Sequence, residues 1–196
     1  MYKLIGTAGT RAFRVLWMLE ELGVDYDHLG AAPRSPDVTA VSPLGKVPVL
    51  MVDDVAIPDS TAILTFLADK HGALTFPAGS LERARQDAMT FRALDELDAV
   101  LWVAARHSFI LPEEHRVPEV KNSLKHEFQH NLARIAAEIE GPFVMGETMT
   151  IADIVLCHCG SWARAAQFPD APPAFVEYMR GLRGREAFKR ASAKRA

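Results

Sequence analysis

The sequence predicts a chain of two domains, a mixed α+β domain followed by an all-α helical bundle. Short apolar runs typical of strands alternate with helical patterns over residues 2–71. After Pro77-Ala78-Gly79 the strand signals disappear, and long amphipathic patterns occupy the rest of the chain. The chain has 196 residues, of which 49% are hydrophobic and 24% charged, so it can bury a proper core. We therefore expect a first domain at 1–77, a linker at 78–82 and a helical domain at 83–196.

The first domain is predicted to alternate strands and helices. Its expected elements, in order, are a strand (residues 2–5), a helix (12–22), a strand (24–29), a Pro-rich irregular segment with room for one helical turn (31–42), a hairpin (47–52 and 55–57) and a helix (60–71). The first helix carries an apolar stripe that includes Phe13, Leu16 and Trp17. Gly23 and Gly72 follow the two helices, at the position where glycine commonly ends a helix. The order β-α-β-(α)-β-β-α is that of a thioredoxin-like domain.

The second domain is predicted to be helical throughout. Amphipathic patterns are expected to form helices at residues 82–107, 117–139 and 174–183. Thr150 and Asp153 have the spacing of a capping box, in which each side chain bonds the other's backbone N–H, so another helix is expected to begin there. The basic segment from Arg183 to Arg195 is interpreted as a solvated helix end.

Two neighbouring motifs of the first domain predict a site for a small, charged peptide. In the segment 42–50 (SPLGKVPVL), Pro48 cannot donate to a sheet ladder, so it belongs at a turn or a strand start. If the Val47–Pro48 bond is cis, the N–H and C=O of Val47 face outward and an extended peptide can pair with them. Asp59 and Ser60 stand at a helix start, whose amide groups and dipole attract a carboxylate. Taken separately, each motif also has a plainer interpretation, a strand end at Pro48 and a helix cap at Asp59 or Ser60.

In these motifs the chain resembles the glutathione transferase family. The segment 44–50 (LGKVPVL), a short hairpin, and an acidic residue with Ser at a helix start occur in the order that the family shows. The family also carries the capping motif of the helical domain, so the resemblance spans nearly the whole chain. It implies that Val47, before the cis Pro48, pairs with the cysteinyl unit of glutathione. It also implies that Asp59 and Ser60 hold the γ-glutamyl end.

Two basic residues are expected beside this glutathione site. Lys46 directly precedes Val47. Arg34 follows the second predicted strand and is expected to reach a terminal carboxylate of glutathione, the alternative being an ordinary surface arginine.

Activation of the glutathione thiol is predicted to come from the loop between the first strand and the first helix. The thiol is mostly protonated at neutral pH, so something must donate a hydrogen bond to the thiolate. Family members use Tyr, Ser or Cys in or near this loop, but the segment 6–12 (GTAGTRA) contains none of them. Thr10 is the candidate donor, with a helix cap as the equal alternative, and Arg11 adds a fixed positive charge. Without Cys-x-x-Cys in this loop, the protein cannot exchange disulfides as a redoxin does.

The resemblance implies an enzyme, a glutathione transferase that activates the thiol for attack on small, mostly apolar electrophiles. Two alternatives stay open, a glutathione-dependent reductase of peroxides or disulfides and a non-catalytic glutathione-binding protein of the same fold. Trp102, Arg106 and Phe109 are the expected substrate pocket, because helical spacing puts them near one face of the long helix that would face the cleft between the domains. Interior packing is the plainer interpretation of the same residues.

A homodimer is expected by analogy with two-domain members of the family. The long helix has a charged side that suits a contact between two identical surfaces. Its residues are Arg92, Asp95, Glu96 and Asp98.

Composition excludes other classes of partner. A formal net charge of −3 and a pI near 6.2 give no electrostatic footprint for nucleic acid. Charged residues interrupt the first twenty positions, so neither a signal peptide nor a membrane span is expected and the cytoplasm is the expected location. Cys157 and Cys159 are expected to be buried thiols, and no metal is expected because no compact set of ligands has zinc-like spacing. Glutathione is the one expected cofactor, as a cosubstrate.

Overall fold

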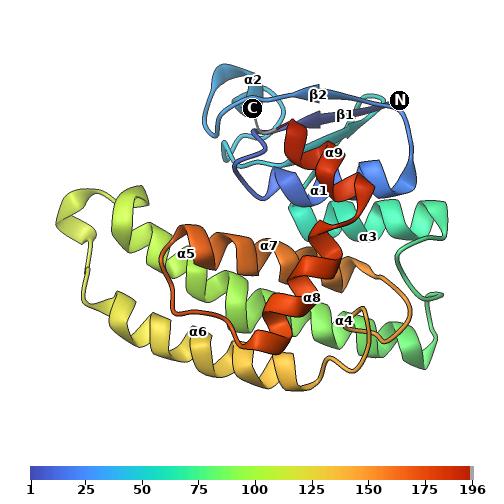
Figure 1. The fold of residues 1–196 in the computed structure, drawn as a ribbon. Coiled ribbons are helices and arrows are strands. Elements are labelled where there is room, and N and C mark those ends of the chain that lie inside the picture. Colours follow the sequence, from blue (N-terminus) through green and yellow to red (C-terminus); the bar gives the residue numbers. More distant parts are fainter. Residues whose placement is uncertain (195–196) are drawn as a thin grey trace. The chain divides into compact units, whose positions relative to one another are not determined.

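The chain folds into two compact units in the computed structural model, which describes residues 1–194. The first unit consists of Met1–Ala78 together with the chain from Leu182 onward, and the second unit consists of Gly79–Gly181. These contact units differ from the expected ranges at the C-terminal end, because helix α9 (Glu186–Ala193) packs against helix α1 (Ala12–Leu22) (Figure 1).

The first unit is built on a four-stranded sheet with the order β2-β1-β3-β4. Its elements are β1 (Tyr2–Ile5), α1, β2 (Tyr26–Leu29), α2 (Pro36–Thr39), β3 (Val49–Val52), β4 (Val55–Pro58) and α3 (Ser60–His71). Strand β2 runs parallel to β1, whereas β3 pairs antiparallel with both β1 and β4. This arrangement confirms the predicted thioredoxin-like domain.

Strand β3 begins two residues later than predicted. The Val47–Pro48 bond is cis, as expected, and the ladder starts at Val49. Pro48 has no N–H to contribute to the ladder, which explains why pairing starts after it.

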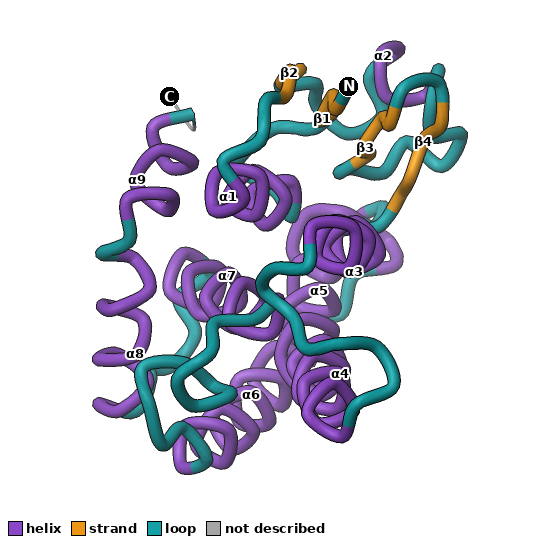
Figure 2. The backbone as a smooth tube through the Cα atoms, turned by 90° about the vertical axis from the view of Figure 1, so that its right-hand side faces the viewer, coloured by secondary structure: helices purple, strands orange, loops and turns teal. Residues whose placement is uncertain are grey.

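The sheet is covered on both faces. On one face, Val38 of α2 packs with Ile5, Val49 and Ala31 in a buried cluster. Side chains alternate along a strand, so the neighbouring Leu4 of β1 points to the other face, and it is fully buried. Helices α1 and α3 pack side by side on that face (Figure 2).

The second unit is helical, as predicted. Its α-helices are α4 (Leu81–Ala93), α5 (Val100–Ala105), α6 (Val120–Ala137), α7 (Ile151–Ala165) and most of α8 (Pro173–Arg183). The single helix expected at 82–107 is a helical run in which two π-helical segments, η1 (Leu94–Ala99) and η2 (Arg106–Ile110), flank α5. A short 3-10 segment, η3 (Glu113–His115), follows this run.

The capping box that begins α7 is also the buried polar centre of the second unit. The fully buried Asp153 carboxylate accepts hydrogen bonds from the Thr150 N–H (2.7 Å), the Val144 N–H (2.8 Å) and the Tyr178 hydroxyl (2.8 Å). Burial raises the pKa of Asp153, although these hydrogen bonds act in the opposite direction. One carboxylate therefore ties together the start of α7, the segment before it and α8.

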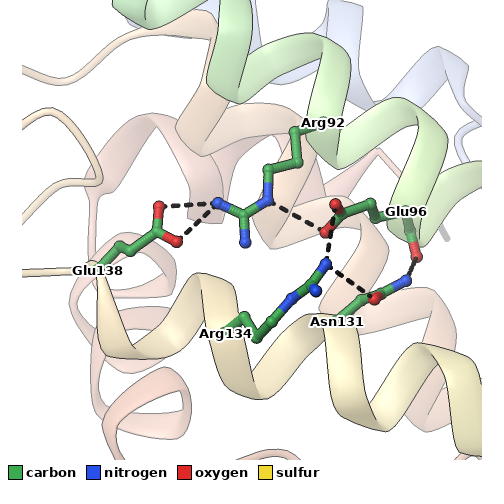
Figure 3. A network of polar contacts seen from close by, with 5 residues as sticks. All are labelled: Arg92, Glu96, Asn131, Arg134 and Glu138. Carbon is green, nitrogen blue, oxygen red and sulfur yellow. Dashed lines mark hydrogen bonds and ion pairs between the residues drawn. The ribbon is translucent and has the colours of Figure 1, made fainter.

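An ion-pair network joins α4 and η1 to α6 (Figure 3). Arg92 donates to both carboxylate oxygens of Glu138, at 2.7 and 2.8 Å, and to Glu96 at 3.1 Å. Arg134 donates to Glu96 at 3.2 Å, and the Asn131 side chain donates to the Glu96 carbonyl at 3.2 Å. The hydrogen bonds to Glu138 raise the pKa of the Arg92 guanidinium, so this arginine stays charged.

This network includes two residues of the charged side of the long helix. Arg92 and Glu96 are paired within the second unit, and the expected contact of this side with a second copy stays a prediction. Asp98 is buried, and Asp95 alone of the four residues is exposed. Counting charges along a helix does not reveal which of them are paired inside the same subunit.

The basic C-terminal segment also differs from the prediction over residues 183–194, and Arg195 lies outside the described residues. It was interpreted as a solvated helix end, but α9 is attached to α1. Phe188 packs edge-on against Trp17 with 5.0 Å between ring centroids. Arg185 pairs with Glu21 at 2.6 Å and Arg190 pairs with Glu20 at 2.7 Å.

Two further features of the structure concern membrane-spanning helices and metal-binding groups. Within residues 1–194, no helix combines the length and the apolar character that a membrane crossing requires. The same described residues contain no group of three or more His, Cys, Asp or Glu side chains placed to hold a metal ion.

Candidate functional site

The sheet register brings the predicted glutathione-binding segments to one end of the first unit. Ile5 at the end of β1 pairs with Val49 at the start of β3, and Val49 pairs with Pro58 at the end of β4. The loop after β1, the Val47–Pro48 turn and the start of α3 therefore lie at the same end of the sheet. The end of β2 lies there too, because Leu29 is the parallel neighbour of Ile5.

Gly6 brings the β1–α1 loop into contact with Val47. Its backbone has φ +138°, and a Cβ built on it would lie 2.9 Å from Val47 Cβ and 3.0 Å from Ala12 Cβ. A side chain at this position does not fit, so the glycine allows the three segments to approach. Among the described residues, neither the N–H nor the C=O of Val47 has a hydrogen-bond partner. The edge at Val47 can therefore pair with an extended peptide.

Asp59 caps helix α3. Its Oδ1 accepts from the N–H groups of Thr61 (2.8 Å) and Ala62 (3.0 Å), and its backbone has φ +73°, a region where Asp and Asn are more common than other non-glycine residues. These two amides are thus occupied by the chain's own carboxylate. The geometry therefore agrees with the helix-cap interpretation of Asp59. The second carboxylate oxygen, Oδ2, remains available to a positively charged group.

Ser60 is the first residue of α3 and is only 3% exposed. Its hydroxyl oxygen accepts a hydrogen bond from Arg14 Nη1 at 3.3 Å. Within the part of the chain that is described, the Ser60 N–H has no acceptor. A ligand carboxylate at this helix start can therefore accept from the Ser60 N–H and from its O–H.

Thr10 has the geometry of a cap in the loop before α1. Its hydroxyl donates to the Thr7 carbonyl at 2.7 Å and accepts from the Ala12 N–H at 3.2 Å. Of the two roles that the sequence left open, capping is the one that the hydrogen bonds display. Arg11, the next residue, is partly exposed and is the N-cap residue of α1.

Arg34 and Lys46 are both neighbours of Gly45, Arg34 in space and Lys46 in the sequence. The Arg34 N–H donates to the Gly45 carbonyl at 2.9 Å, and a Cβ built on Gly45 would lie 3.0 Å from Arg34 Cγ. Both basic side chains are exposed. Because Lys46 is next to Val47, two positive charges stand close to the Val47 edge, where they can attract an anionic peptide end.

The expected substrate residues belong to the second unit. Trp102 lies in α5 and is partly buried, whereas Arg106 and Phe109 lie in η2 and are exposed, Phe109 by 67%. Their assignment to a substrate pocket stays a prediction.

Sequence reasoning missed three residues at this end of the first unit. Arg14 of α1 donates to the Ser60 hydroxyl oxygen. His28 of β2 bonds the Gly6 carbonyl through Nε2 at 2.9 Å, so that nitrogen carries the proton. Thr7 holds the turn before α1 through its carbonyl, which accepts from both the N–H and the hydroxyl of Thr10. Of these three residues, only Thr7 could have been identified from the sequence, because the loop before the first helix contains just two hydroxyl side chains, Thr7 and Thr10.

Comparison with known proteins places the predicted site in a domain of known type. Residues 10–70 match the family model described as the N-terminal domain of glutathione S-transferase. Glutathione S-transferase 3 of Schizosaccharomyces pombe is 27% identical over 175 residues, which cover 84% of this chain and 67% of the relative. Residues 10–70 therefore match the N-terminal domain of the glutathione S-transferase family. The resemblance drawn from the motifs is thus confirmed.

The chain is also similar to proteins with other names. Elongation factor 1-gamma 3 of Oryza sativa subsp. japonica is 25% identical over 163 residues, 77% of this chain and 38% of the relative.

Solved structures support the fold over the whole chain. A glutathione transferase from Methylococcus capsulatus superposes with a TM-score of 0.87 at 23% identity, covering 99% of this chain and 98% of that one. A glutathione transferase homologue from Sulfitobacter, solved with bound glutathione, superposes with a TM-score of 0.82 at 20% identity, covering 99% and 98%.

Proposed function

We propose that this protein is a glutathione transferase. It binds glutathione at the end of the sheet that carries the β1–α1 loop, the Val47–Pro48 turn and the start of α3, and it activates the thiol for attack on small, mostly apolar electrophiles. One observation supports this proposal most. An unpaired backbone edge at Val47 and a helix start with an available N–H and hydroxyl at Ser60 lie at the same end of the sheet. The bound glutathione of the Sulfitobacter relative agrees with this ligand.

Each part of the site suits one part of the tripeptide. The γ-glutamyl carboxylate accepts from Ser60, and the γ-glutamyl ammonium faces Oδ2 of Asp59. The cysteinyl unit pairs with the N–H and C=O of Val47, which fixes where the sulfur lies. The glycyl carboxylate meets the positive charges of Lys46 and Arg34.

The proposed reaction begins with loss of the thiol proton to solvent. The N-terminal dipole of α1 and the positive charge of Arg11 favour the resulting thiolate. Its sulfur then forms a bond to an electrophilic carbon, and a leaving group departs with the electron pair of its bond. We propose Trp102, Arg106 and Phe109 as contacts for the electrophile.

Calorimetric titration with glutathione tests the proposal, with the dipeptide Cys-Gly as a matched ligand. Cys-Gly keeps the thiol but lacks the γ-glutamyl group, so it should bind at least tenfold more weakly if Asp59 and Ser60 hold that group. Turnover is then measured with an aryl halide, a hydroperoxide and a mixed disulfide, each with glutathione. A folded protein that does not bind glutathione contradicts the proposal, and turnover of the hydroperoxide or the disulfide alone would make the protein a reductase.

A second candidate function is glutathione binding without conjugation. It is favoured by the hydrogen bonds of Thr10, whose hydroxyl proton points to the Thr7 carbonyl. Absorbance of the thiolate across pH separates the two functions, because a binding protein leaves the pKa of the bound thiol near that of free glutathione.

We also propose that the protein forms a homodimer through helix α4. Leu81 and Phe91 are 74% and 63% exposed, and they share one helix face with the exposed Ala84 and Ala88. Sedimentation of the wild type and of Phe91→Glu tests this. A dimer that Phe91→Glu converts to a monomer supports the contact, and a monomeric wild type contradicts it.

A further inference from the structure

We propose that the hydroxyl of Thr7, rather than that of Thr10, donates the hydrogen bond that stabilises the glutathione thiolate. This inference rests on the proposed function and names the residue that acts on the sulfur. It follows from the hydrogen bonds of the two hydroxyl groups in the β1–α1 loop.

The Thr10 hydroxyl has its single proton in use. It donates to the Thr7 carbonyl at 2.7 Å, a typical O–H···O distance, while its oxygen accepts from the Ala12 N–H. Donation to a sulfur would break the first of these bonds at the start of α1. Such a donor has to be reorganised before it can act.

The Thr7 hydroxyl has its proton available. Its oxygen receives only a long contact from the Gly9 N–H, at 3.5 Å, and among residues 1–194 no group accepts its proton. Thr7 is partly exposed, so a ligand can reach it. The hydroxyl can donate to a ligand without losing a hydrogen bond within the protein.

The backbone of Thr7 is held in place. Its N–H donates to the Ala31 carbonyl at 3.1 Å, and its carbonyl accepts two bonds from Thr10. The preceding Gly6 lies against Val47, to which the cysteinyl unit is proposed to pair. Thr7 therefore carries its hydroxyl on a fixed backbone next to the expected position of the sulfur, whereas Thr10 keeps the loop in shape.

The test compares Thr7→Val, Thr7→Ser and Thr10→Val in the full-length protein. For each variant, the thiolate absorbance of bound glutathione is followed across pH and the glutathione Kd is measured by calorimetry. Valine keeps the shape of threonine without its donor, and serine restores the donor. Two other groups near the loop, Arg11 and His28, are unchanged in all three variants, so their contribution is the same in each. Thr39→Val, which removes a hydroxyl bound to backbone in α2, is the matched control.

In the wild type, we expect a bound thiol with a pKa below that of free glutathione. Thr7→Val should raise this pKa by about one to two, a roughly 10- to 100-fold loss of thiolate near neutral pH, with a much smaller change in Kd. Thr7→Ser should restore the low pKa. Thr10→Val should act mainly on thermal stability, because it removes a cap.

Two results overturn this assignment while leaving glutathione binding intact. One is a bound thiol whose pKa is the same in Thr7→Val as in the wild type. The other is a pKa that rises in Thr10→Val and not in Thr7→Val. Absence of glutathione binding in the folded wild type is a different outcome, which overturns the proposed function together with this inference.

Discussion

Arg14 of α1 donates a 3.3 Å hydrogen bond to the hydroxyl oxygen of Ser60, the first residue of α3. Both residues are buried. Because this oxygen is the acceptor, the Ser60 proton is free to point away from Arg14. The buried guanidinium thus orients the hydroxyl as a donor toward a ligand at the start of α3.

Ser60→Ala should therefore weaken glutathione binding and also reduce stability. The ligand carboxylate loses a charge-assisted hydrogen bond, worth roughly 1.5–3 kcal/mol, and Arg14 loses one buried acceptor, a loss of about 1–3 kcal/mol in stability. Calorimetry with glutathione measures the first effect and urea unfolding the second. Ser161→Ala is the control, since its hydroxyl donates to the Cys157 carbonyl within a helix of the second unit. If both variants bind glutathione like the wild type, Ser60 does not contact the carboxylate.

Two substitutions of Asp59 should separate its capping role from its charge. In Asp59→Asn, the amide oxygen of the new side chain can still accept from the Thr61 and Ala62 N–H groups, and asparagine tolerates a positive φ, so stability should stay within about 0.5 kcal/mol. Asp59→Ala removes the cap and should lower stability by about 1 kcal/mol.

Glutathione binding should respond to the charge of Asp59 in both variants. The neutral amide of Asp59→Asn no longer attracts the γ-glutamyl ammonium, and the affinity should fall roughly tenfold, because hydrogen bonds between charged groups are about twice as strong as neutral ones. Unchanged affinity in Asp59→Asn, together with weaker binding in Asp59→Ala, would assign Asp59 to capping alone.

The fold could be predicted from the sequence where the signals are local. Helix α1 begins and ends where its apolar stripe and Gly23 put it, and α3 runs from Ser60 to His71 as expected. The capping box at Thr150 and Asp153 predicted the start of α7. In each case the residues that decide the boundary lie within one helical turn of it.

Features that depend on distant residues could not be predicted. Nothing near Arg185 or Arg190 in the sequence indicates that their partners are Glu21 and Glu20. The same holds for Arg14, whose contact with Ser60 spans 46 positions of the chain. The choice between Thr7 and Thr10 also required coordinates, since the sequence does not tell which hydroxyl already donates within the loop.

Tyr178→Phe should destabilise the second unit through Asp153. Its hydroxyl donates to the buried Asp153 carboxylate at 2.8 Å, and a hydrogen bond to a charged group contributes roughly 1.5–3 kcal/mol. Burial, followed by the neighbouring Asp153 charge, raises the pKa of Tyr178 well above its usual value, so this donor keeps its proton. Urea unfolding measures the loss. Tyr26→Phe, whose partly buried hydroxyl donates to Glu20, is the control and should cost less; equal losses would show that the burial of Asp153 adds nothing.

The attachment of α9 to α1 should weaken in acid because of Glu20. Burial opposes ionisation of this carboxyl, but hydrogen bonds from Tyr26, Arg190 and Lys194 together outweigh it and lower the pKa of Glu20. A carboxyl whose pKa is lower in the folded state stabilises the fold above its unfolded pKa, about 4.3, and this contribution disappears as the pH falls through the folded pKa. The wild type should therefore be more stable than Glu20→Gln at pH ~7, and the difference should shrink steadily toward pH ~3 in urea unfolding. Glu177→Gln removes the same charge from an exposed ion pair on α8 and should give a smaller difference that changes less with pH. A difference between the wild type and Glu20→Gln that does not depend on pH would mean that α9 is held by the packing of Phe188 rather than by its ion pairs.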